Sequence, residues 1–447
     1  MPETRSKGRS TPPSKITLDR IAELGVVGAG GAGFPSAVKF SAQVSTVIVN
    51  GAECEPLLHK DKELLHHRAA PMLAGLRAAV ELTGASEAVI GIKEKYTDVI
   101  DAITPLLTPG IRVQRLRDTY PAGDEFVLVY DVTGKVIPPG GLPKDVGAVV
   151  TNVETLVNIG QDKPVTRKYL TVAGAVREPV TLSVPVGMSI GEVIEAAGGS
   201  TVADFGVLLG GVMMGRLAEN LDVPVTKTLG GIIVLPKSHH MIQWYSMGWK
   251  QVEKIGRSAC DQCRFCTELC PRYLLGHPIQ PHRAMQSLGF VGDKVQLIAS
   301  TLYCCECNIC SLIACPENLD PKTVCVQAKP AARENKLFWN GDTANVQPHP
   351  MQADRRIPMR RLISKLGLTE FRNVGPLVDR ELTPRSVTLP LKQHTGAPAV
   401  AVVAVGSKVK EGDLLAAPAA GALGARIHAS IAGVVRRVDG ESVTIEA

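Results

Sequence analysis

Runs of apolar residues in the first third of the chain alternate between two spacings. Residues 44–49 and 88–92 form short, nearly continuous apolar runs, which are typical of buried strands, and residues 111–115 also have a strand pattern. Residues 72–83 and 97–107 instead repeat their apolar positions at helical spacing, and a short helix is expected at 17–24. Because strands and helices alternate, the pattern predicts an α/β domain with a mainly parallel sheet.

The pattern changes after residue 163. Residues 169–175, 180–186 and 232–236 have strand-like patterns and 189–197 a helical one, which resembles a small ubiquitin-like β-grasp module. Residues 246–333 have a helical character and contain every cysteine except Cys54. The last part of the chain is rich in Gly and Val and predicts short alternating strands. The predicted fold class is therefore multidomain α/β with separate β and helical modules.

These changes predict six segments with different characters. They are a disordered basic tail (1–15), an α/β domain (16–163), a β-grasp module (164–240), a helical cysteine domain (241–334), a linker (335–386) and a small β domain (387–447). The linker is expected to contain a basic helix at 355–367. Its arginines, Arg355, Arg356, Arg360 and Arg361, are either one solvated helix face or part of a docking surface.

Composition adds limits on the class of protein. A chain of 447 residues is too long for one ordinary core, which favours three or four domains. Its formal net charge of +6 is too small to argue for nucleic acid. No apolar run is long enough to span a membrane, and residues 1–15 lack the apolar core of a secretory signal. Eleven cysteines in such a chain indicate metal binding in a reducing cytoplasm.

The cysteines form two motifs in which three cysteines at spacing three precede a fourth that is followed by proline. This is the bacterial ferredoxin pattern, which predicts two [4Fe–4S] clusters. Since the fourth cysteine of each motif ligates the other cluster in such proteins, two ligand sets are expected. They are Cys260, Cys263, Cys266 and Cys315 for one cluster, and Cys304, Cys307, Cys310 and Cys270 for the other.

The alternative to iron–sulfur clusters is zinc, but structural zinc sites usually present cysteine pairs separated by a longer segment. The second motif has four residues before its last cysteine where the first has three, so a small difference in geometry is expected. Cys54, Cys305 and Cys325 are left over, and free buried cysteine is common.

A glycine loop at 28–33 matches G-x-G-x-x-G, and Glu53 follows twenty residues after Gly33. A Rossmann site requires a strand before this loop and a helix after it, whereas a helical pattern precedes the loop here. A plain glycine-rich turn is the other interpretation. The loop is followed by Phe34-Pro35 and Lys39, and then by the segments NGAECEP (50–56), YPAGDE (120–125) and TNVET (151–155).

This set of motifs resembles the flavin-binding subunit of NADH:quinone oxidoreductases and its relatives, the RnfC proteins of Rnf complexes and the PduS-type corrinoid reductases. The resemblance covers nearly the whole chain from Ile16. It implies that the α/β domain binds FMN and NADH, and that the β-grasp module is SLBB-like. The implied flavin pocket consists of Gly30, Gly31, Gly33, Lys39, Asn50, Glu53, Tyr120, Gly123, Asn152 and Glu154. Phe34, Glu55 and Glu125 are implied on the nicotinamide side, with Glu55 and Glu125 as catalytic candidates.

Two features distinguish this chain within the resemblance. The flavin-binding protein of complex I usually has Arg second in its glycine loop, whereas Ala29 stands here, so NADH or phosphate contacts are expected to differ. The segment 387–447 resembles the lipoyl-like barrel-sandwich domain that RnfC proteins carry at the N-terminus. Its C-terminal place matches the PduS arrangement, and no lysine in it has the neighbours that lipoylation requires, so a structural or docking role is expected.

The resemblance implies that NADH reduces FMN and that the two clusters pass the electrons on to a corrinoid, taking cob(III)alamin towards cob(I)alamin. It places the protein in the cytoplasm, inside a bacterial microcompartment where a B12-dependent diol dehydratase works. The implied partners are a microcompartment shell protein and the adenosyltransferase or dehydratase system, with no nucleic acid and no membrane span. His394, His428 and the pair His239–His240 are either axial ligands of the corrinoid or ordinary histidines.

Two other functions remain open at this stage. One is an NADH dehydrogenase component like those of Rnf or complex I, which would feed another acceptor; the C-terminal place of the barrel argues against Rnf. The other is a non-catalytic electron relay docked to the microcompartment shell. Loss of NADH-dependent flavin bleaching in a protein whose clusters are still chemically reducible would favour the relay.

Overall fold

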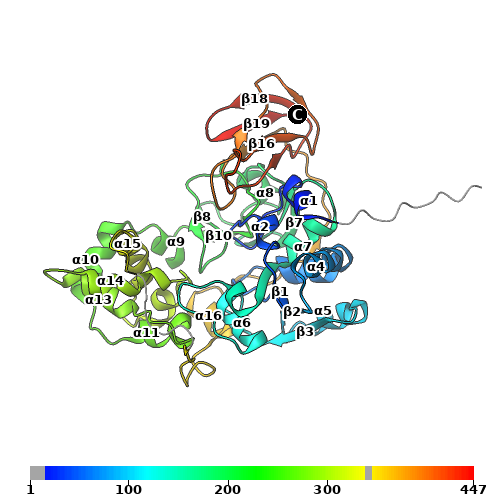
Figure 1. The fold of residues 1–447 in the computed structure, drawn as a ribbon. Coiled ribbons are helices and arrows are strands. Elements are labelled where there is room, and N and C mark those ends of the chain that lie inside the picture. The colour runs from blue at the N-terminus through cyan, green and yellow to red at the C-terminus, as the bar shows by residue number, and fades with distance from the viewer. Residues whose placement is uncertain (1–15, 338–344) are drawn as a thin grey trace, which may run out of the picture.

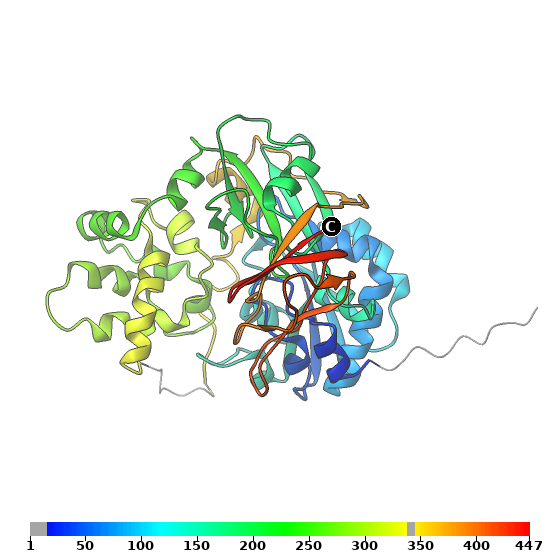
Figure 2. The ribbon, with the colours of Figure 1, turned by 90° about the horizontal axis from the view of Figure 1, so that it is seen from above.

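The computed structural model describes residues 16–337 and 345–447, so the predicted disordered tail lies outside the described residues. The chain forms four modules, with the helical cysteine domain at one side and the C-terminal β domain on top in Figure 1. Figure 2, seen from above, shows the cysteine domain again set apart from the α/β domain. This arrangement agrees with the predicted multidomain α/β fold class.

The α/β domain is built on a four-stranded sheet with the order β3-β2-β1-β5, in which every pairing is parallel. Its strands are β1 (Thr46–Gly51), β2 (Glu87–Lys93), β3 (Ile111–Leu116) and β5 (Ala148–Asn152). Val47 and Val49 point into one core, and Ile48 between them points into another, as the two-residue period of a strand requires. Both faces of the sheet are therefore covered, which explains the continuous apolar runs in its strands.

Helices α1 (Leu18–Glu23), α3 (Lys60–His67), α4 (Ala69–Thr83), α5 (Thr97–Ile103) and α7 (Val153–Gly160) contribute to the first core. Helix α6 (Glu125–Thr133) covers the other face. Helices α4 and α7 cross closely because each carries a glycine at the contact. A Cβ on Gly75 would lie 2.1 Å from the carbonyl oxygen of Leu156, and one on Gly160 would lie 1.9 Å from that of Pro71.

We expect Gly75→Ala to lower the free energy of unfolding by about 1–3 kcal/mol, because the added methyl must push the backbone of α7 away. Gly440→Ala is the matched control, since nothing in the described part of the chain lies within 4 Å of a Cβ placed there. Urea denaturation of both variants measures the difference. Equal stability of the two variants would contradict the close helix contact.

The β-grasp module contains a six-stranded sheet with the order β12-β7-β6-β10-β8-β9. The predicted strands are present as β6 (Arg167–Gly174), β7 (Val180–Pro185) and β10 (Gly231–Pro236), and the predicted helix as α8 (Ile190–Ala196). Three strands were not anticipated: β8 (Phe205–Leu209), β9 (Arg216–Leu217) and β12 (Leu377–Val378). The last of them comes from the linker and extends the sheet by pairing with β7.

The cysteine domain is helical, as predicted. It contains α10 (Trp249–Ala259), α11 (Phe265–Glu268), α12 (Pro271–Leu274), α13 (Pro281–Gly289), α14 (Val295–Ile298) and α15 (Pro321–Glu334), and α9 (His240–Tyr245) leads into it. The C-terminal domain contains two small sheets, β13-β19-β18-β15 and β14-β16-β17, around one apolar core. Its strands are β13 (Ser386–Pro390), β14 (Val400–Ala401), β15 (Lys408–Val409), β16 (Leu414–Ala417), β17 (Ile427–His428), β18 (Gly433–Val438) and β19 (Ser442–Glu446).

The linker corrects one prediction. The basic helix α16 begins at Met359 and ends at Lys365, because residues Ile357–Pro358 form strand β11 and pair with β4 (Thr119–Tyr120). Arg355 and Arg356 therefore lie before the helix and are not part of one solvated face. Arg355 pairs with Glu268 of the cysteine domain, and Arg356 makes a two-pronged contact with Asp131 of α6 at 2.5 and 2.6 Å. Arg360 and Arg361 lie on the helix itself and are exposed.

Candidate functional site

The sheet of the α/β domain has one point at which its strand order reverses. Strands β1, β2 and β3 follow one another in one direction, and β5 lies on the other side of β1. Ligands of such open sheets bind outside the carboxyl ends of the strands at this point. Asn50 and Asn152 lie at the ends of the two strands there and are paired in register. The geometry therefore selects the crevice above these two asparagines as the candidate flavin site.

The glycine loop lies over this crevice. The N–H of Gly28 donates to the carbonyl oxygen of Phe34 at 2.9 Å, which closes the loop, and α1 precedes it where a Rossmann site would have a strand. A Cβ on Gly30 would lie 3.3 Å from the Cβ of Asn152. Gly31 has φ +120° and is exposed, and nothing described lies within 4 Å of a Cβ placed on it. Gly30 and Gly31 thus present open backbone to a ligand, as a phosphate cradle requires.

Gly33 faces a different neighbour. A Cβ on it would lie 2.9 Å from Thr228 and 3.1 Å from the Cα of His394 in the C-terminal domain. Thr395 fixes the loop further, because its N–H donates to the carbonyl oxygen of Gly33 at 3.0 Å and its hydroxyl to that of Ala32 at 2.7 Å. Ala29 is 1% exposed, and its N–H donates to Thr155 Oγ1. At the position where the complex I proteins have Arg, this chain therefore has the buried Ala29, and the surroundings accommodate its methyl group.

A network of buried charges supports the crevice from below. Lys60 Nζ lies 2.7 Å from Asp61 and 3.1 Å from Glu154, and Lys168 Nζ lies 2.5 Å from the same carboxylate oxygen of Glu154. Asn152 joins the network by donating to Asp61 at 2.8 Å. Since buried ions are costly unless paired, these side chains hold one another in fixed positions.

The network shifts the pKa values of its members. Burial lowers the pKa of Lys168 to about 8, in spite of its contact with Glu154. Lys60 behaves differently: although burial opposes its charge, Asp61 and Glu154 hold its pKa above the usual value. Burial raises the pKa of Glu53 to about 7, and Asp61 adds to the rise while Lys60 opposes it. Glu53 accepts the backbone N–H of Asp61 at 2.8 Å.

The remaining predicted flavin residues lie in three places. Asn50 donates to the carbonyl oxygen of Gly123 at 2.8 Å, so these two residues meet at the crevice. Lys39 Nζ donates to the carbonyl oxygen of Val150 at 2.9 Å and lies 3.3 Å from Glu125, at the rim. Tyr120 is buried and points out of the crevice, since its hydroxyl donates to the carbonyl oxygen of Cys307 at 2.7 Å. Tyr120 therefore joins the α/β domain to the second cysteine motif.

Glu55 is also placed away from the glycine loop. Its carboxylate accepts the backbone N–H groups of Met213 at 2.9 Å and Met214 at 2.8 Å in the β-grasp module. A Cβ on Gly211, which has φ +134°, would lie 2.4 Å from this carboxylate. Glu55 thus fixes the β-grasp loop against the α/β domain, and its predicted place beside the nicotinamide stays a prediction, as do those of Phe34 and Glu125.

Glu55 should make stability depend on pH. Burial raises its pKa from 4.5 to about 7, although the N–H groups that it accepts oppose the rise. Between these two values the folded state binds more protons than the unfolded chain, so the stabilising contribution is complete below about pH 4.5 and is lost as the pH rises through about 7. We expect Glu55→Gln to remove this part of the pH dependence in urea denaturation measured from about pH 5 to about pH 8. The exposed Glu94→Gln is the control, and an unchanged slope for Glu55→Gln would contradict the assignment.

The two cysteine motifs share a pair of left-handed backbone positions. Gln262 and Glu306, each two residues after the first cysteine, have φ +58° and +61°, and Arg264 and Asn308, each four residues after it, have φ +69° and +67°. Such values are uncommon outside glycine and cluster at functional sites. The repeated pair of left-handed residues wraps each three-cysteine loop around a centre, which is the arrangement that a cubane needs.

The structure brings together the first predicted ligand set. Cys260, Cys263, Cys266 and Cys315 line one small cavity, although Cys315 comes from the other motif. Burial together with Cys304, Cys270 and Cys266 raises the pKa of Cys310, and Cys305, burial, Cys270 and Cys310 raise that of Cys307. These thiols are therefore near one another, and the second ligand set stays a prediction. In the described residues no three His, Cys, Asp or Glu side chains are close enough for one metal ion. In a cubane each thiolate binds a different iron, so the predicted clusters do not require such a close group.

The extra residue of the second motif is accommodated by a different helical turn. Residues Cys310–Ala314 form a π-helical turn, which holds one more residue per turn than an α-helix, whereas the first motif uses the α-helical turn Phe265–Glu268. The expected small difference in geometry is confirmed. Of the spare cysteines, Cys325 hydrogen-bonds Cys304 and thereby lowers the pKa of that ligand to about 7.

Several residues that the structure makes important could not be assigned a role from the sequence. Lys168 follows Arg167 at the start of strand β6, and no local pattern indicates that it is buried. Lys60 and Asp61 closely follow the NGAECEP segment, but no local pattern indicates what they contact. Arg272 of the cysteine domain pairs with Asp124 at 2.9 Å and stacks on Phe126, and no local pattern indicates this contact either.

A switch-point crevice under a glycine loop, joined through Tyr120 to a two-motif cysteine domain, defines a flavo-iron–sulfur electron-transfer protein. Family models match in the same order as the modules: the Nuo51 FMN-binding domain at 21–161, the SLBB domain at 169–217, the 4Fe-4S dicluster domain at 259–320 and the RnfC barrel sandwich hybrid domain at 376–446. The predicted FMN and [4Fe–4S] cofactors and the predicted fold class are thereby confirmed.

Similarity extends over the whole chain. Cobalamin reductase PduS of Salmonella typhimurium is 47% identical over 432 residues, and that of Citrobacter freundii is 44% identical over 433 residues; each match covers 96% of this chain and 95% of the relative. The chain therefore belongs to the family of the cobalamin reductases PduS, an oxidoreductase family. The C component of the Na+-translocating ferredoxin:NAD+ oxidoreductase complex of Acetobacterium woodii is 34% identical over 265 residues, 57% of each chain.

Among solved structures, a chain of an NAD+-reducing [NiFe]-hydrogenase in the H2-reduced state superposes with a TM-score of 0.48 and 20% identity, over 74% of this chain and 62% of that chain. This likeness is too partial to carry an argument. Within residues 16–337 and 345–447, no helix is both long and apolar enough to cross a membrane.

Proposed function

We propose that this protein uses NADH to reduce a corrinoid, taking cob(III)alamin towards cob(I)alamin. One observation carries the proposal: the chain matches cobalamin reductases PduS over nearly its full length. The hydrogen bond from Tyr120 to the carbonyl oxygen of Cys307, which joins the flavin-type domain to the second cysteine motif, supports it. FMN accepts two electrons together and the clusters transfer one at a time, which is the chemistry needed between a hydride donor and a cobalt ion.

The side chains divide this work. Gly30 and Gly31 present open backbone for the phosphate, and Asn50 and Asn152 face the flavin from the strand ends, with Gly123 bound to Asn50. Glu53 and Glu154, with Lys60, Asp61 and Lys168, hold Asn152 and the glycine loop in place. Lys39 and Glu125 stand at the rim, where Phe34 and the nicotinamide of NADH would meet.

The setting belongs to the same proposal. A cobalamin reductase that supports a B12-dependent diol dehydratase would work inside a bacterial microcompartment, beside the dehydratase and adenosyltransferase. A shell protein is the proposed anchor, and the exposed Arg360 and Arg361 of α16 offer it positive charge.

An anoxic absorbance titration tests the function. The protein is reconstituted with FMN, iron and sulfide, NADH is added, and hydroxocobalamin follows. Bleaching of the flavin and cluster bands by NADH, followed by protein-dependent formation of cob(II)alamin, supports the proposal. Bleaching without cobalamin reduction would point to an NADH dehydrogenase with another acceptor, in line with the likeness to the RnfC proteins. Clusters that respond to dithionite but not to NADH would indicate a relay.

A further inference from the structure

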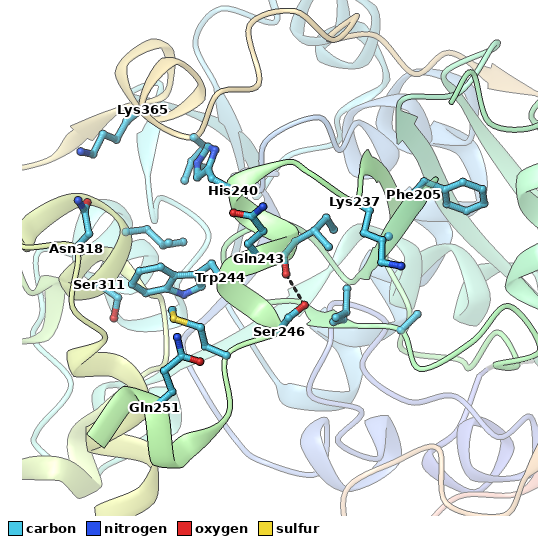
Figure 3. A pocket seen from close by; sticks show the side chains of 17 residues that line it. Phe205, Lys237, His240, Gln243, Trp244, Ser246, Gln251, Ser311, Asn318 and Lys365 are labelled. Carbon is cyan, nitrogen blue, oxygen red and sulfur yellow. Dashed lines mark hydrogen bonds between the residues drawn. The ribbon is translucent and has the colours of Figure 1, made fainter. Parts of the chain in front are cut away.

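A groove of about 1020 Å³ opens where the β-grasp module, the cysteine domain and the linker helix meet. Its walls come from β8 and β9, from α9, from the end of α16 and from the second cysteine motif. Figure 3 shows side chains that line it, with Trp244 and Gln243 of α9 between Ser311 and Asn318 on one side and Lys237 and Phe205 on the other. This volume is at the upper end of the range for small-molecule sites, so it suits a large ligand.

The groove lies against the second cysteine motif. None of the residues that we assign to the flavin crevice lines it. Ser311 and Leu312, which line it, directly follow Cys310 in the chain. Ser311 Oγ lies 3.9 Å from Cys310 Sγ and is held by a 2.7 Å hydrogen bond to Asp320. A molecule in the groove would therefore touch the polypeptide turn that carries a cluster ligand.

The lining has a particular chemistry. Leu312 and Ile242 are buried and Trp244 is half-buried, so the floor is apolar and partly aromatic. The exposed rim carries neutral amides on Gln243, Gln251 and Asn318. Lys365 adds a positive charge at the rim, and Lys237 adds a second that also lies 3.6 Å from Asp204.

His240 adds a nitrogen donor to this rim. It is exposed and stacks on His239 with 4.6 Å between the ring centroids. His239 accepts the N–H of Met241 at 3.2 Å, and this contact fixes the stack at the start of α9. Burial, His239 and Lys365 lower the pKa of His240, so its imidazole is neutral and can offer a lone pair at neutral pH.

We propose that this groove is the corrinoid site, with the macrocycle over Trp244, its peripheral amides at Gln243, Gln251 and Asn318, and His240 facing the cobalt. A corrinoid combines an apolar ring, several amides, one phosphodiester and a metal that accepts imidazole, and the groove offers a partner for each. The inference rests on the proposed function and adds the place where the acceptor binds. The reaction balances, because one NADH becomes NAD+ and a proton and supplies the two electrons that take cob(III)alamin to cob(I)alamin.

Three variants test the site: His240→Ala, Gln243→Ala and, as control, His66→Ala, an exposed histidine of α3 that does not line the groove. Equilibrium dialysis with hydroxocobalamin measures binding, and the visible spectrum of the bound cobalamin reports imidazole ligation. NADH-driven ferricyanide reduction measures electron transfer from NADH that does not require a ligand in the groove. Thermal unfolding checks that the variants are folded.

We expect His240→Ala to weaken cobalamin binding roughly tenfold and to remove the imidazole feature of the spectrum. Gln243→Ala should weaken binding several-fold, with ferricyanide reduction unchanged in all variants. Wild-type binding and spectra in both groove variants would overturn the assignment, while cobalamin reduction by the wild type would still support the proposed function. If the wild type neither binds nor reduces cobalamin although NADH bleaches its clusters, the proposed function fails and this site fails with it.

Discussion

Replacing Glu154 with alanine should lower the free energy of unfolding by about 3–5 kcal/mol and abolish flavin binding. Glu154 is fully buried and accepts hydrogen bonds from Lys60 Nζ at 3.1 Å, Lys168 Nζ at 2.5 Å and the N–H of Tyr169 at 2.9 Å. Without it Lys168, whose pKa burial already lowers to about 8, loses its counter-ion, and the carbonyl oxygen of Ala29 is its remaining hydrogen-bond partner among the described residues. Because that carbonyl belongs to the glycine loop, the loop should lose its position together with the network.

Urea denaturation and FMN equilibrium dialysis measure the two effects. The double variant Glu154→Gln with Lys168→Met removes both charges and should recover part of the stability, since the cost comes mainly from an unpaired buried ion. The exposed Glu94→Ala is a control for loss of one negative charge. A loss below about 1 kcal/mol in Glu154→Ala, or wild-type FMN affinity, would show that the network does not support the crevice.

The repeating elements of the fold were accessible from the sequence because their causes are local. Strands β1 and β2 bury both faces, so their apolar runs are nearly continuous, and the edge strand β3 alternates apolar and polar residues. The helices between the strands keep helical spacing. The two cysteine loops are also local, since three ligands of each cluster lie within seven residues of sequence. The π-turn after Cys310 could be anticipated in outline because one additional residue must be accommodated between fixed ligands.

The contacts that assemble the modules were not accessible in the same way. Glu154 meets Lys60 across 94 residues of sequence, Tyr120 meets Cys307 across 187, and Arg356 meets Asp131 across 225. Each of these side chains has an ordinary local sequence, so the spacing of apolar residues does not indicate which residue it contacts. The same reason explains why no local pattern indicates that Glu55, which the resemblance places beside the nicotinamide, also holds the β-grasp loop across 158 residues of sequence. Resemblance to a family could identify which residues matter, but not which of them touch the ligand and which position the others.

Replacing one ligand of each cluster should reveal which cysteines share a cluster. We expect Cys263→Ser and Cys315→Ser to lose the same cluster, because both side chains line the cavity that also contains Cys260 and Cys266. Cys307→Ser and Cys270→Ser should lose the other, because the charges of Cys270 and Cys310 act on Cys307. Each variant should retain about half of the iron, and cobalamin reduction by NADH should fall to near the background rate.

Electron paramagnetic resonance of the dithionite-reduced proteins distinguishes the two cases, since the members of a pair should leave the same remaining signal. Cys54→Ser is the matched control: this cysteine lies in the α/β domain, where its Sγ would be 3.2 Å from a Cβ on Gly123, and the variant should retain both signals. If Cys315→Ser instead left the same signal as Cys307→Ser, each motif would supply all four ligands of its own cluster. The π-turn would then have to bring Cys315 back to Cys304, Cys307 and Cys310, whereas the structure turns it towards Cys260, Cys263 and Cys266.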